Sequence, residues 1–399
     1  MRPAADKAEQ VACVPYDVVS KDQLRSFVDE NPLSFLRVTR PRYEFERGQR
    51  PSWGQIFEKA KTNLAWFRQE GILAADQDDA VYVYRLSNGD HSQTGVVACC
   101  SIDEYESGLI KKHENVKPDK VDERAGHILT LRAQTGLIFL AFRGTQTVSH
   151  LIAKTTAGQP IYDFDGVDGV RHTLWRVDGG EEFVKAFREV PSIYIADGHH
   201  RIEAARLARN ELRGQTPSDT GNEDYNYVMA GMFPAEELRI LPYNRAVRDL
   251  GGLSEEEFID RLKTNFAEIG SEERVPERHG DMCVYIRDGW RCFRVNTNLL
   301  HEADPIERLD VSILQTYVLG PILGIEDART SERLTFVGGK KSVDEIERLV
   351  NTGEAAVGFS LYPPTMDDML TVSDMGETMP PKSTWFEPKL KDGLLVHLI

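Results

Sequence analysis

The sequence predicts a mixed α/β fold, and three observations carry this prediction. Short runs rich in Val, Tyr, Leu and Phe, such as residues 80–86 and 137–142, are typical of strands. Amphipathic runs with apolar residues near one face, such as residues 53–69, are typical of helices. The two kinds of run alternate irregularly along the chain, so we expect mixed sheets rather than one regular doubly wound sheet.

The first third of the chain is expected to open with a strand over residues 11–19. Ser52 is placed to be the N-cap of the helix over residues 53–69. Asn88-Gly89 is a dipeptide typical of two-residue hairpin turns. It predicts that the strand before it pairs with a strand over residues 94–101.

The remaining elements follow from the same two patterns. We expect further helices over residues 118–133, 181–189, 199–212, 254–266, 306–319 and 342–351. We expect further strands over residues 170–177, 192–196, 227–233, 238–244 and 355–361, and a hairpin around Asp288-Gly289. Glu345 follows Ser342 by three residues, which predicts a capping box at the start of the last helix.

Length and charge limit the class of protein. The chain has 399 residues, of which 41% are hydrophobic and 28% charged. This composition is ordinary for a globular protein, and the length predicts two or three packed units. The net charge is −16. A duplex-binding protein needs a basic face to neutralise phosphates, so the acidic balance argues against nucleic acid as a general partner.

The sequence predicts a soluble, cytoplasmic protein without a membrane anchor. No apolar run approaches the roughly 20 residues that span a bilayer, and residues 1–10 lack the hydrophobic core of a signal peptide. The five cysteines are odd in number and form no Cys-x-x-Cys pair. This argues against a disulfide scaffold and a zinc knuckle. Cys99 and Cys100 lie in an apolar run and are expected to be small core residues.

Five consecutive residues, Asp197-Gly198-His199-His200-Arg201, form the strongest candidate site. They follow the expected strand over residues 192–196 and open the expected helix over residues 199–212. A helix N-terminus presents N–H groups and a partial positive charge, so it attracts anions. Glycine lets the backbone turn sharply there. The sequence therefore predicts a phosphate or nucleotide site on Gly198, His199, His200 and Arg201, with Asp197 and His200 as candidates for catalysis.

Two simpler interpretations compete with the phosphate site. In the first, Asp197 is an ordinary N-cap and the histidines are solvated; however, cations in the first turn are unfavourable by about 0.3–1 kcal/mol each unless an anion binds there. In the second, the histidines hold a metal. Neighbouring residues on a helix point about 100° apart, and no His-Glu-x-x-His motif is present, so we expect no transition metal.

The residues of the turn also carry a resemblance to a known family. Tyr194-Ile195-Ala196-Asp197-Gly198-His199-His200-Arg201, with Glu203-Ala204-Ala205, resembles the signature of a widespread prokaryotic family known only as a domain of unknown function. Matching stretches occur along nearly the whole chain: Pro15-Tyr16-Asp17-Val18, Asn31-Pro32, Ser34-Phe35-Leu36-Arg37, Leu241-Pro242-Tyr243-Asn244-Arg245 and Met379-Pro380-Pro381-Lys382-Ser383-Thr384. The resemblance implies a metabolic role linked to serine.

The turn is also similar to the nucleotide-binding motif of the ParB/sulfiredoxin superfamily, most of all to that of free serine kinases. This likeness covers about residues 96–233. Those kinases pair such a turn with an upstream His-Glu whose glutamate is the general base. The resemblance implies this role for Glu114, which follows His113. A carboxylate suits the task because it takes the proton of an attacking hydroxyl. The alternative is that Glu114 is an ordinary surface residue of a charged loop.

The stretch Met379 to Lys389 is a second candidate. Its two prolines restrain the backbone, and a cation and two hydroxyls stand close together in Lys382, Ser383 and Thr384. These three residues are candidates to complete an anion pocket. The alternative is a packed C-terminal loop.

Together these features predict a small-molecule phosphotransferase with three segments: an N-terminal α/β segment (1–95), a ParB/sulfiredoxin-like core (96–245) and a C-terminal α/β segment (246–399). We expect Mg²⁺ with a nucleotide or polyphosphate donor, and free serine or a related hydroxylated metabolite as acceptor. Two alternatives stay open: a nucleotide-dependent, DNA-associated ParB-like module, and a metabolite-binding protein with a vestigial site.

Overall fold

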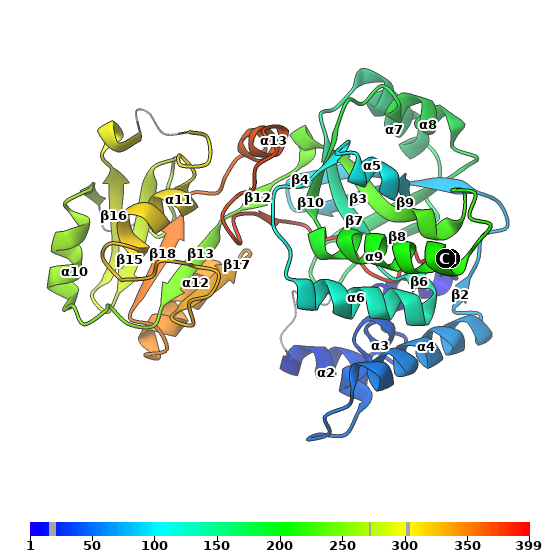
Figure 1. The fold of residues 1–399 in the computed structure, drawn as a ribbon, viewed down its shortest axis with the longest axis horizontal. Coiled ribbons are helices and arrows are strands. Elements are labelled where there is room, and N and C mark those ends of the chain that lie inside the picture. The colour runs from blue at the N-terminus through cyan, green and yellow to red at the C-terminus, as the bar shows by residue number, and fades with distance from the viewer. Residues whose placement is uncertain (16–20, 271–272, 301–303) are drawn as a thin grey trace. The chain divides into compact units, whose positions relative to one another are not determined.

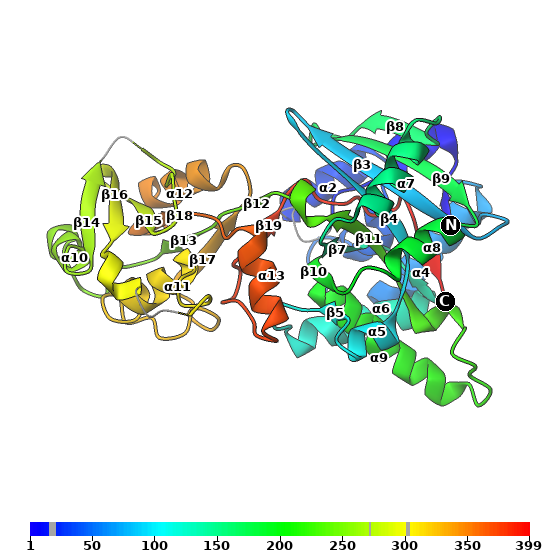
Figure 2. The same ribbon diagram turned by 90° about the horizontal axis from the view of Figure 1, so that it is seen from above.

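The computed structural model describes residues 1–15, 21–270, 273–300 and 304–399, and it has the mixed α/β fold that the sequence predicts (Figure 1). The chain divides into two compact units. Unit 1 comprises residues 1–112, 116–238 and 388–399, and unit 2 comprises residues 113–115 and 239–387. Both chain termini belong to unit 1 (Figure 2). Unit 2 is therefore an insertion in the chain of unit 1.

Unit 1 is built on an eight-stranded sheet with the order β5-β10-β7-β11-β4-β3-β9-β8. Its strands are β3 (Ala80–Asn88), β4 (His91–Ser101), β5 (Ile110–Lys111), β7 (Ile138–Phe142), β8 (Tyr162–Asp165), β9 (Arg171–Asp178), β10 (Ile193–Asp197) and β11 (Tyr227–Pro234). The pairs β5–β10 and β7–β11 are parallel, and the other neighbours are antiparallel. The sheet is therefore mixed, as the irregular alternation of elements predicts.

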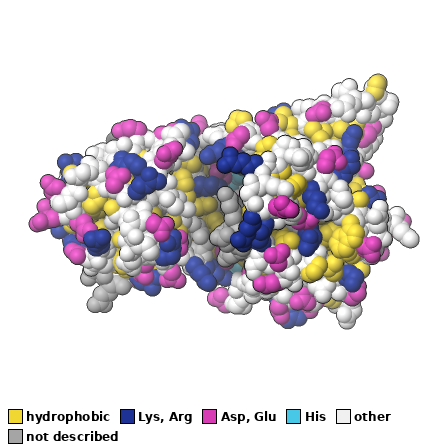
Figure 3. Space-filling model, turned by 90° about the horizontal axis from the view of Figure 1, so that it is seen from below, with side chains coloured by type: hydrophobic (Ala, Val, Ile, Leu, Met, Phe, Trp, Pro, Cys, Tyr) yellow, Lys and Arg dark blue, Asp and Glu magenta, His cyan; other side chains and the backbone are white. Residues whose placement is uncertain are grey.

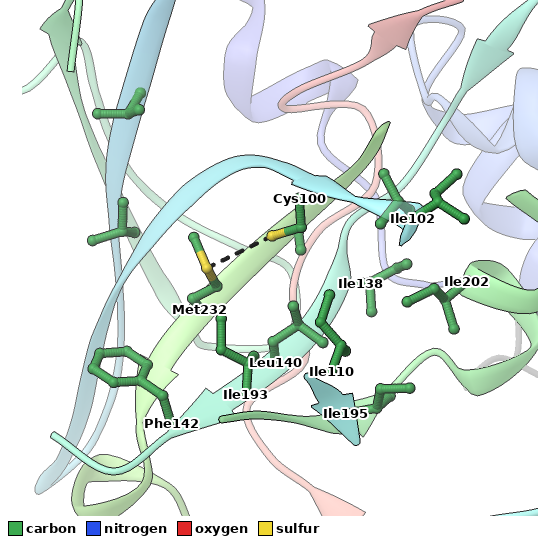
Figure 4. Packing of buried hydrophobic residues seen from close by; sticks show 14 of the residues in the cluster. Cys100, Ile102, Ile110, Ile138, Leu140, Phe142, Ile193, Ile195, Ile202 and Met232 are labelled. Carbon is green, nitrogen blue, oxygen red and sulfur yellow. Dashed lines mark hydrogen bonds between the residues drawn. The ribbon is translucent and has the colours of Figure 1, made fainter. Parts of the chain in front are cut away.

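The helices of unit 1 are α1 (Ala8–Val11), α2 (Lys21–Glu30), α3 (Leu36–Thr39), α4 (Trp53–Gln69), α5 (Ile102–Glu106), α6 (Pro118–Leu131), α7 (Gln146–Thr156), α8 (Glu181–Phe187) and α9 (His199–Gln215). Helices α5 to α9 share a hydrophobic cluster with the sheet, whereas buried residues of α1 to α4 form a second cluster. Leu140 of β7, Ile195 of β10 and Ile202 of α9 are buried in one cluster (Figure 4). This packing fixes the end of β10 and the start of α9, where the candidate site lies.

Two short strand pairs attach the chain ends to unit 1. β1 (Arg2–Pro3) pairs with β2 (Leu73–Ala74), and β6 (Ala133–Gln134) pairs with β20 (His397–Leu398). The C-terminal segment over residues 388–399 is thus an integral part of this unit.

Unit 2 is built on a six-stranded antiparallel sheet with the order β14-β16-β15-β18-β13-β17. Its strands are β13 (Tyr243–Val247), β14 (Phe266–Gly270), β15 (Asp281–Ile286), β16 (Gly289–Val295), β17 (Leu334–Gly338) and β18 (Val357–Leu361); β12 (Ile240–Leu241) pairs separately with β19 (Trp385–Phe386). Its helices are α10 (Glu255–Leu262), α11 (Asp310–Leu314), α12 (Ser342–Asn351) and α13 (Met366–Asp374). α11 continues into a π-helix over Gln315–Leu319.

Several local predictions are confirmed. The Ser52 side chain accepts a hydrogen bond from the backbone N–H of Gln55, and the Gln55 side chain returns one, so α4 begins with a full capping box. Asn88-Gly89 and Asp288-Gly289 each lie at the turn of an antiparallel hairpin, β3–β4 and β15–β16.

Other local predictions are wrong. The strand expected over residues 11–19 is not formed in its described part, because α1 runs to Val11 and only Cys13 makes a bridge, to Asp392; residues 16–20 lie outside the described part. The strand expected over residues 238–244 is divided by Pro242, which has no N–H to donate to a ladder. The capping box at Ser342 is absent, since this hydroxyl instead accepts a hydrogen bond from the Asn244 side chain.

The structure also contains a disulfide, between Cys283 and Cys292. The two cysteines face each other across β15 and β16. A Cys-x-x-Cys pattern does not detect this pair, because the two cysteines are 9 residues apart in the sequence. The register of the hairpin brings them together. Cys100 is buried as expected, whereas Cys99 is exposed.

The two units differ from the three predicted segments. The predicted boundary after residue 95 falls inside β4, whose pairing with β3 places both strands in one sheet. Hydrogen bonding across the hairpin therefore joins residues 1–95 to the following segment.

One face of the molecule carries side chains of both charges. On the face shown in Figure 3, Lys and Arg side chains are interspersed with Asp and Glu side chains. Within the described ranges, no helix has the length and apolar character needed to cross a bilayer.

Candidate functional site

The predicted turn is present in unit 1. β10 is buried up to Ala196 and ends at Asp197, and α9 begins at His199. This confirms the predicted strand and the predicted helix start. Gly198 joins them with φ 100° and ψ 25°, in the left-handed region that favours glycine. A Cβ at Gly198 would have room, since its nearest neighbours would be 3.5 Å away. The backbone angle, and not crowding, is what requires glycine here.

Asp197 has a partner that the sequence did not indicate. The Lys389 ammonium lies 2.5 Å from the Asp197 carboxylate. Burial disfavours the charged form of Asp197, but the charge and hydrogen bond of Lys389 outweigh this effect and lower the pKa of Asp197 to about 2. Asp197 is therefore ionised at neutral pH, and a cation stands at the end of β10.

The two histidines occupy different environments. His199 is buried, whereas His200 is half-buried and its Nε2 accepts a hydrogen bond from the backbone N–H of Lys117, at 3.1 Å. An accepting Nε2 carries no proton, so this geometry describes a neutral His200 with its proton on Nδ1. His200 thus ties the residue before α6 to the start of α9.

The fork of Arg201 is engaged within the protein. Its two terminal nitrogens donate to the two carboxylate oxygens of Asp392, at 2.9 and 3.1 Å. Asp392 is buried, and the side chain of Arg201 is 19% exposed. The backbone of Gly136 packs directly against this pair. A side chain at this position would not fit, because its Cβ would lie 1.6 Å from an Arg201 nitrogen. The bidentate geometry expected for phosphate is therefore used here on a carboxylate.

Residues 389–392 form a set of contacts with the turn and its surroundings. Lys389 pairs with Asp197, Lys391 with Asp168 at 2.7 Å, and Asp392 with Arg201. Sequence reasoning placed the C-terminal candidates at residues 382–384 and missed these residues. The charges at alternate positions 389 and 391 were the available signal, because alternate residues of an extended chain share one face.

The other predicted residues belong to unit 2. Glu114 lines a cavity of about 400 Å³ together with Thr378 and with residues 379–381, which begin the predicted second candidate. Thr384 Oγ1 lies 3.2 Å from Nε2 of His113, and the Ser383 hydroxyl donates to the carbonyl of Pro380 at 2.6 Å.

Lys382 has positive φ, 55°, and its ammonium lies 5.7 Å from the ring centre of Tyr243. Both hydroxyls and the cation of this stretch therefore have partners within unit 2. The structure brings the stretch next to His113-Glu114 but gives its hydroxyls structural hydrogen bonds.

Across the described ranges, no group of three or more His, Cys, Asp and Glu side chains converges as a metal site would require.

Comparisons with known proteins give distant structural likenesses. A search of curated proteins finds no match. Among solved structures, a conserved hypothetical protein from Pyrococcus furiosus is 14% identical, with a TM-score of 0.36 over 74% of this chain and 93% of that one. SbnI with a C-terminal truncation, from Staphylococcus aureus, is 13% identical, with a TM-score of 0.38 over 76% and 87%. A free serine kinase in complex with AMP is 13% identical, with a TM-score of 0.36 over 75% and 91%.

These TM-scores are below 0.5, so the likenesses carry no conclusion about activity. The match to a family is more extensive, because residues 1–312 correspond to the family described as "Protein of unknown function (DUF1015)". This protein therefore belongs to the DUF1015 family.

Proposed function

We propose that this protein is a small-molecule phosphotransferase that uses a nucleotide or another polyphosphate. The donor's phosphates bind at the N-terminus of α9, on Gly198, His199 and His200. The observation that carries the proposal is the turn itself: a buried strand ends at Asp197, Gly198 turns the chain at φ 100°, and a long helix starts at once. This arrangement points helix N–H groups and the positive end of the helix dipole at an anion.

The cation at the turn adds support. Lys389 brings an ammonium group to the end of β10, where it is 16% exposed and paired with Asp197. A phosphate bound at the turn would accept a hydrogen bond from this ammonium, alongside the Asp197 carboxylate. Arg201 is assigned a positioning role, since its fork binds Asp392 and thereby anchors the first turn of α9.

The reaction proposed is transfer of a phosphoryl group to a hydroxyl. Glu114 is the proposed general base, which takes the hydroxyl proton as the new O–P bond forms and the bond to the donor breaks. Free serine or a related hydroxylated metabolite is the proposed acceptor, on the resemblance to free serine kinases. Asp197 is ionised and fits as a carboxylate for Mg²⁺, which is commonly held by one or two carboxylates and the substrate phosphates.

Binding of pyrophosphate, ADP and ATP, measured by calorimetry, tests the site. We expect saturable binding that Gly198→Ala weakens at least tenfold, because alanine disfavours the left-handed backbone. Gly169→Ala is the matched control, since Gly169 also has positive φ, 73°, with open space around it. Wild-type protein that binds none of the three compounds would show that the turn is not a phosphate site.

Turnover tests the reaction itself. Phosphoserine formation from ATP, ADP or pyrophosphate and L-serine, with Mg²⁺, is the expected activity. A DNA-associated module would instead show DNA binding that weakens steeply with salt. That alternative has less support, because the chain carries a net charge of −16.

A further inference from the structure

The cavity of unit 2 contains a buried cation that has no anionic partner among the described residues. Arg245 lies on β13 and is 3% exposed. Its terminal nitrogens donate to the backbone carbonyls of Tyr243, Asn244, Pro381 and Lys382. Within the described ranges, no carboxylate forms an ion pair with it. Burial lowers the pKa of Arg245 to about 9, so the group stays charged at neutral pH.

The same cavity contains a buried acceptor with no donor. Gln315 lines the cavity, and its side-chain nitrogen donates to the carbonyls of Ile325 and Glu326. Its Oε1 is buried and has no hydrogen-bond partner among the described residues. A buried acceptor without a donor is costly, by about 1–3 kcal/mol. Such a group is explained when a ligand supplies the missing donor.

The backbone at Gln315 is also unusual. Gln315–Leu319 forms a π-helix directly after α11, and both of its end residues line the cavity. π-helical turns are rare and occur frequently at functional sites. Here the wider turn coincides with the side chain whose oxygen lacks a donor.

The charges around the cavity favour a ligand with both signs. Asp327 and Arg329 neutralise each other through a bidentate pair. The lining also contains the cation of Arg245 and the carboxylates of Glu114 and Glu326. A simple anion would meet two carboxylates, whereas a zwitterion would pair with both kinds of group.

We propose that the cavity of unit 2 binds a small zwitterion of the α-amino acid class, with its carboxylate at Arg245 and its ammonium at the Gln315 oxygen and the neighbouring carboxylates. The volume of about 400 Å³ suits a small metabolite. Ile306, Val311 and Leu319 offer apolar contacts to its side chain. Because Glu114 lines the same cavity, this ligand would be the phosphoryl acceptor; only that identification rests on the proposed function, and the binding itself does not.

Calorimetric titration of the full chain without any phosphate donor tests the inference. Glycine, L-serine and L-leucine are the zwitterionic probes. L-Glycerate replaces the ammonium of L-serine by a hydroxyl with the same configuration, and ethanolamine lacks the carboxylate. We expect saturable binding of at least one amino acid. If L-serine is that ligand, both analogues should bind at least tenfold more weakly. If glycerate binds as tightly as serine, the site recognises anions and the zwitterion assignment is wrong.

Variants locate the binding. Gln315→Met removes the unpaired oxygen at similar length and should weaken amino-acid binding at least tenfold. Tyr317→Phe is its control on the same π-helix, since the Tyr317 hydroxyl donates to the carbonyl of Leu299 and the residue does not line the cavity. Ala328→Trp, in a half-buried part of the lining, should fill the cavity and abolish binding. Circular dichroism melts confirm folding of each variant.

Two results would overturn the proposal: wild-type protein that binds none of the amino acids, or cavity variants that bind them as wild type does. Because no phosphate donor is present, these results are independent of whether the turn at Gly198 binds polyphosphate.

Discussion

The low pKa of Asp197 owes most to one distant residue, Lys389. Their sequence separation is 192 residues, yet the ammonium and the carboxylate form a direct hydrogen bond. Burial acts in the opposite direction and raises the pKa of Asp197, and the charges of Arg201 and His199 lower it less than Lys389 does. The electrostatics of the turn are therefore set by a side chain from the C-terminal segment as much as by the motif itself.

Lys389→Met should change how stability depends on pH. In the wild type, the pKa of Asp197 is about 2 in the folded state and near 3.8 in the unfolded state. The pair therefore stabilises the fold fully above about pH 4, and this contribution is lost as pH falls through 2. Urea unfolding of both proteins between pH 7 and pH 2 should show a stability difference that shrinks toward the acid end.

Lys154→Met is the control for this measurement, since Lys154 forms an exposed pair with Glu182. It should have little effect at any pH. A Lys389→Met difference that stays constant down to pH 2 would disprove the assigned electrostatic role.

Glu114→Gln should separate binding from chemistry. The amide cannot accept the hydroxyl proton as a carboxylate does, so turnover should fall by roughly 10²–10⁴. Donor affinity, measured by calorimetry with pyrophosphate or a nucleotide, should stay within about twofold because the proposed phosphate contacts are untouched. Normal phosphoserine formation by this variant would remove Glu114 from the mechanism.

At the scale of elements, the start of α9 is held by packing on both sides. Ile202 is buried in the core of the sheet, and the Arg201–Asp392 pair ties the same turn to the C-terminal segment. The segment before β7 makes room for this pair because residue 136 is glycine.

Gly136→Ala should therefore break the pair. The added Cβ would lie 1.6 Å from Arg201 Nη1 and 2.1 Å from Asp392 Oδ1, so both side chains must move. Separating a buried ion pair is costly, and we expect a loss of about 2–4 kcal/mol in the free energy of unfolding. Chemical denaturation measures this loss.

Gly214→Ala, near the end of α9, has open space around the new Cβ. It should be neutral or stabilising by about 0.5–1 kcal/mol, since alanine favours helices. Equal effects of the two substitutions would mean that Arg201 and Asp392 are not tightly packed around Gly136.

At the scale of the whole molecule, the chain leaves unit 1 after residue 238 and returns to it at residue 388. The returning segment supplies Lys389, Lys391 and Asp392, and its backbone pairs with Cys13 and with β6. Unit 1 therefore has long-range contacts with its own C-terminal segment.

Ending the chain after Glu387 should damage unit 1 selectively. Three ion pairs, the bridge to Cys13 and the strand β20 would be lost. Hydrogen exchange followed by mass spectrometry should show lower protection in β10 and α9, while β15 and β18 of unit 2 stay protected. Full protection of β10 in the shortened chain would contradict the assigned role of residues 388–399.

Local signals in the sequence determined a large part of this protein. The Ser52 capping box, the Asn-Gly and Asp-Gly hairpins and the strand–glycine–helix turn at residues 193–199 depend on neighbouring residues. Such features are governed by backbone preferences and local hydrogen bonds, which act over a few residues. The mixed α/β class and the position of the candidate phosphate turn followed from them.

Tertiary structure alone decided which partners those residues meet. Lys389 reaches Asp197, Asp392 takes the fork of Arg201, and Cys283 pairs with Cys292 because strand order and register place distant segments side by side. The buried guanidinium of Arg245 and the Gln315 oxygen line one cavity for the same reason. Burial and charge pairing act through space. A local sequence pattern therefore does not show which distant segments pack against each other.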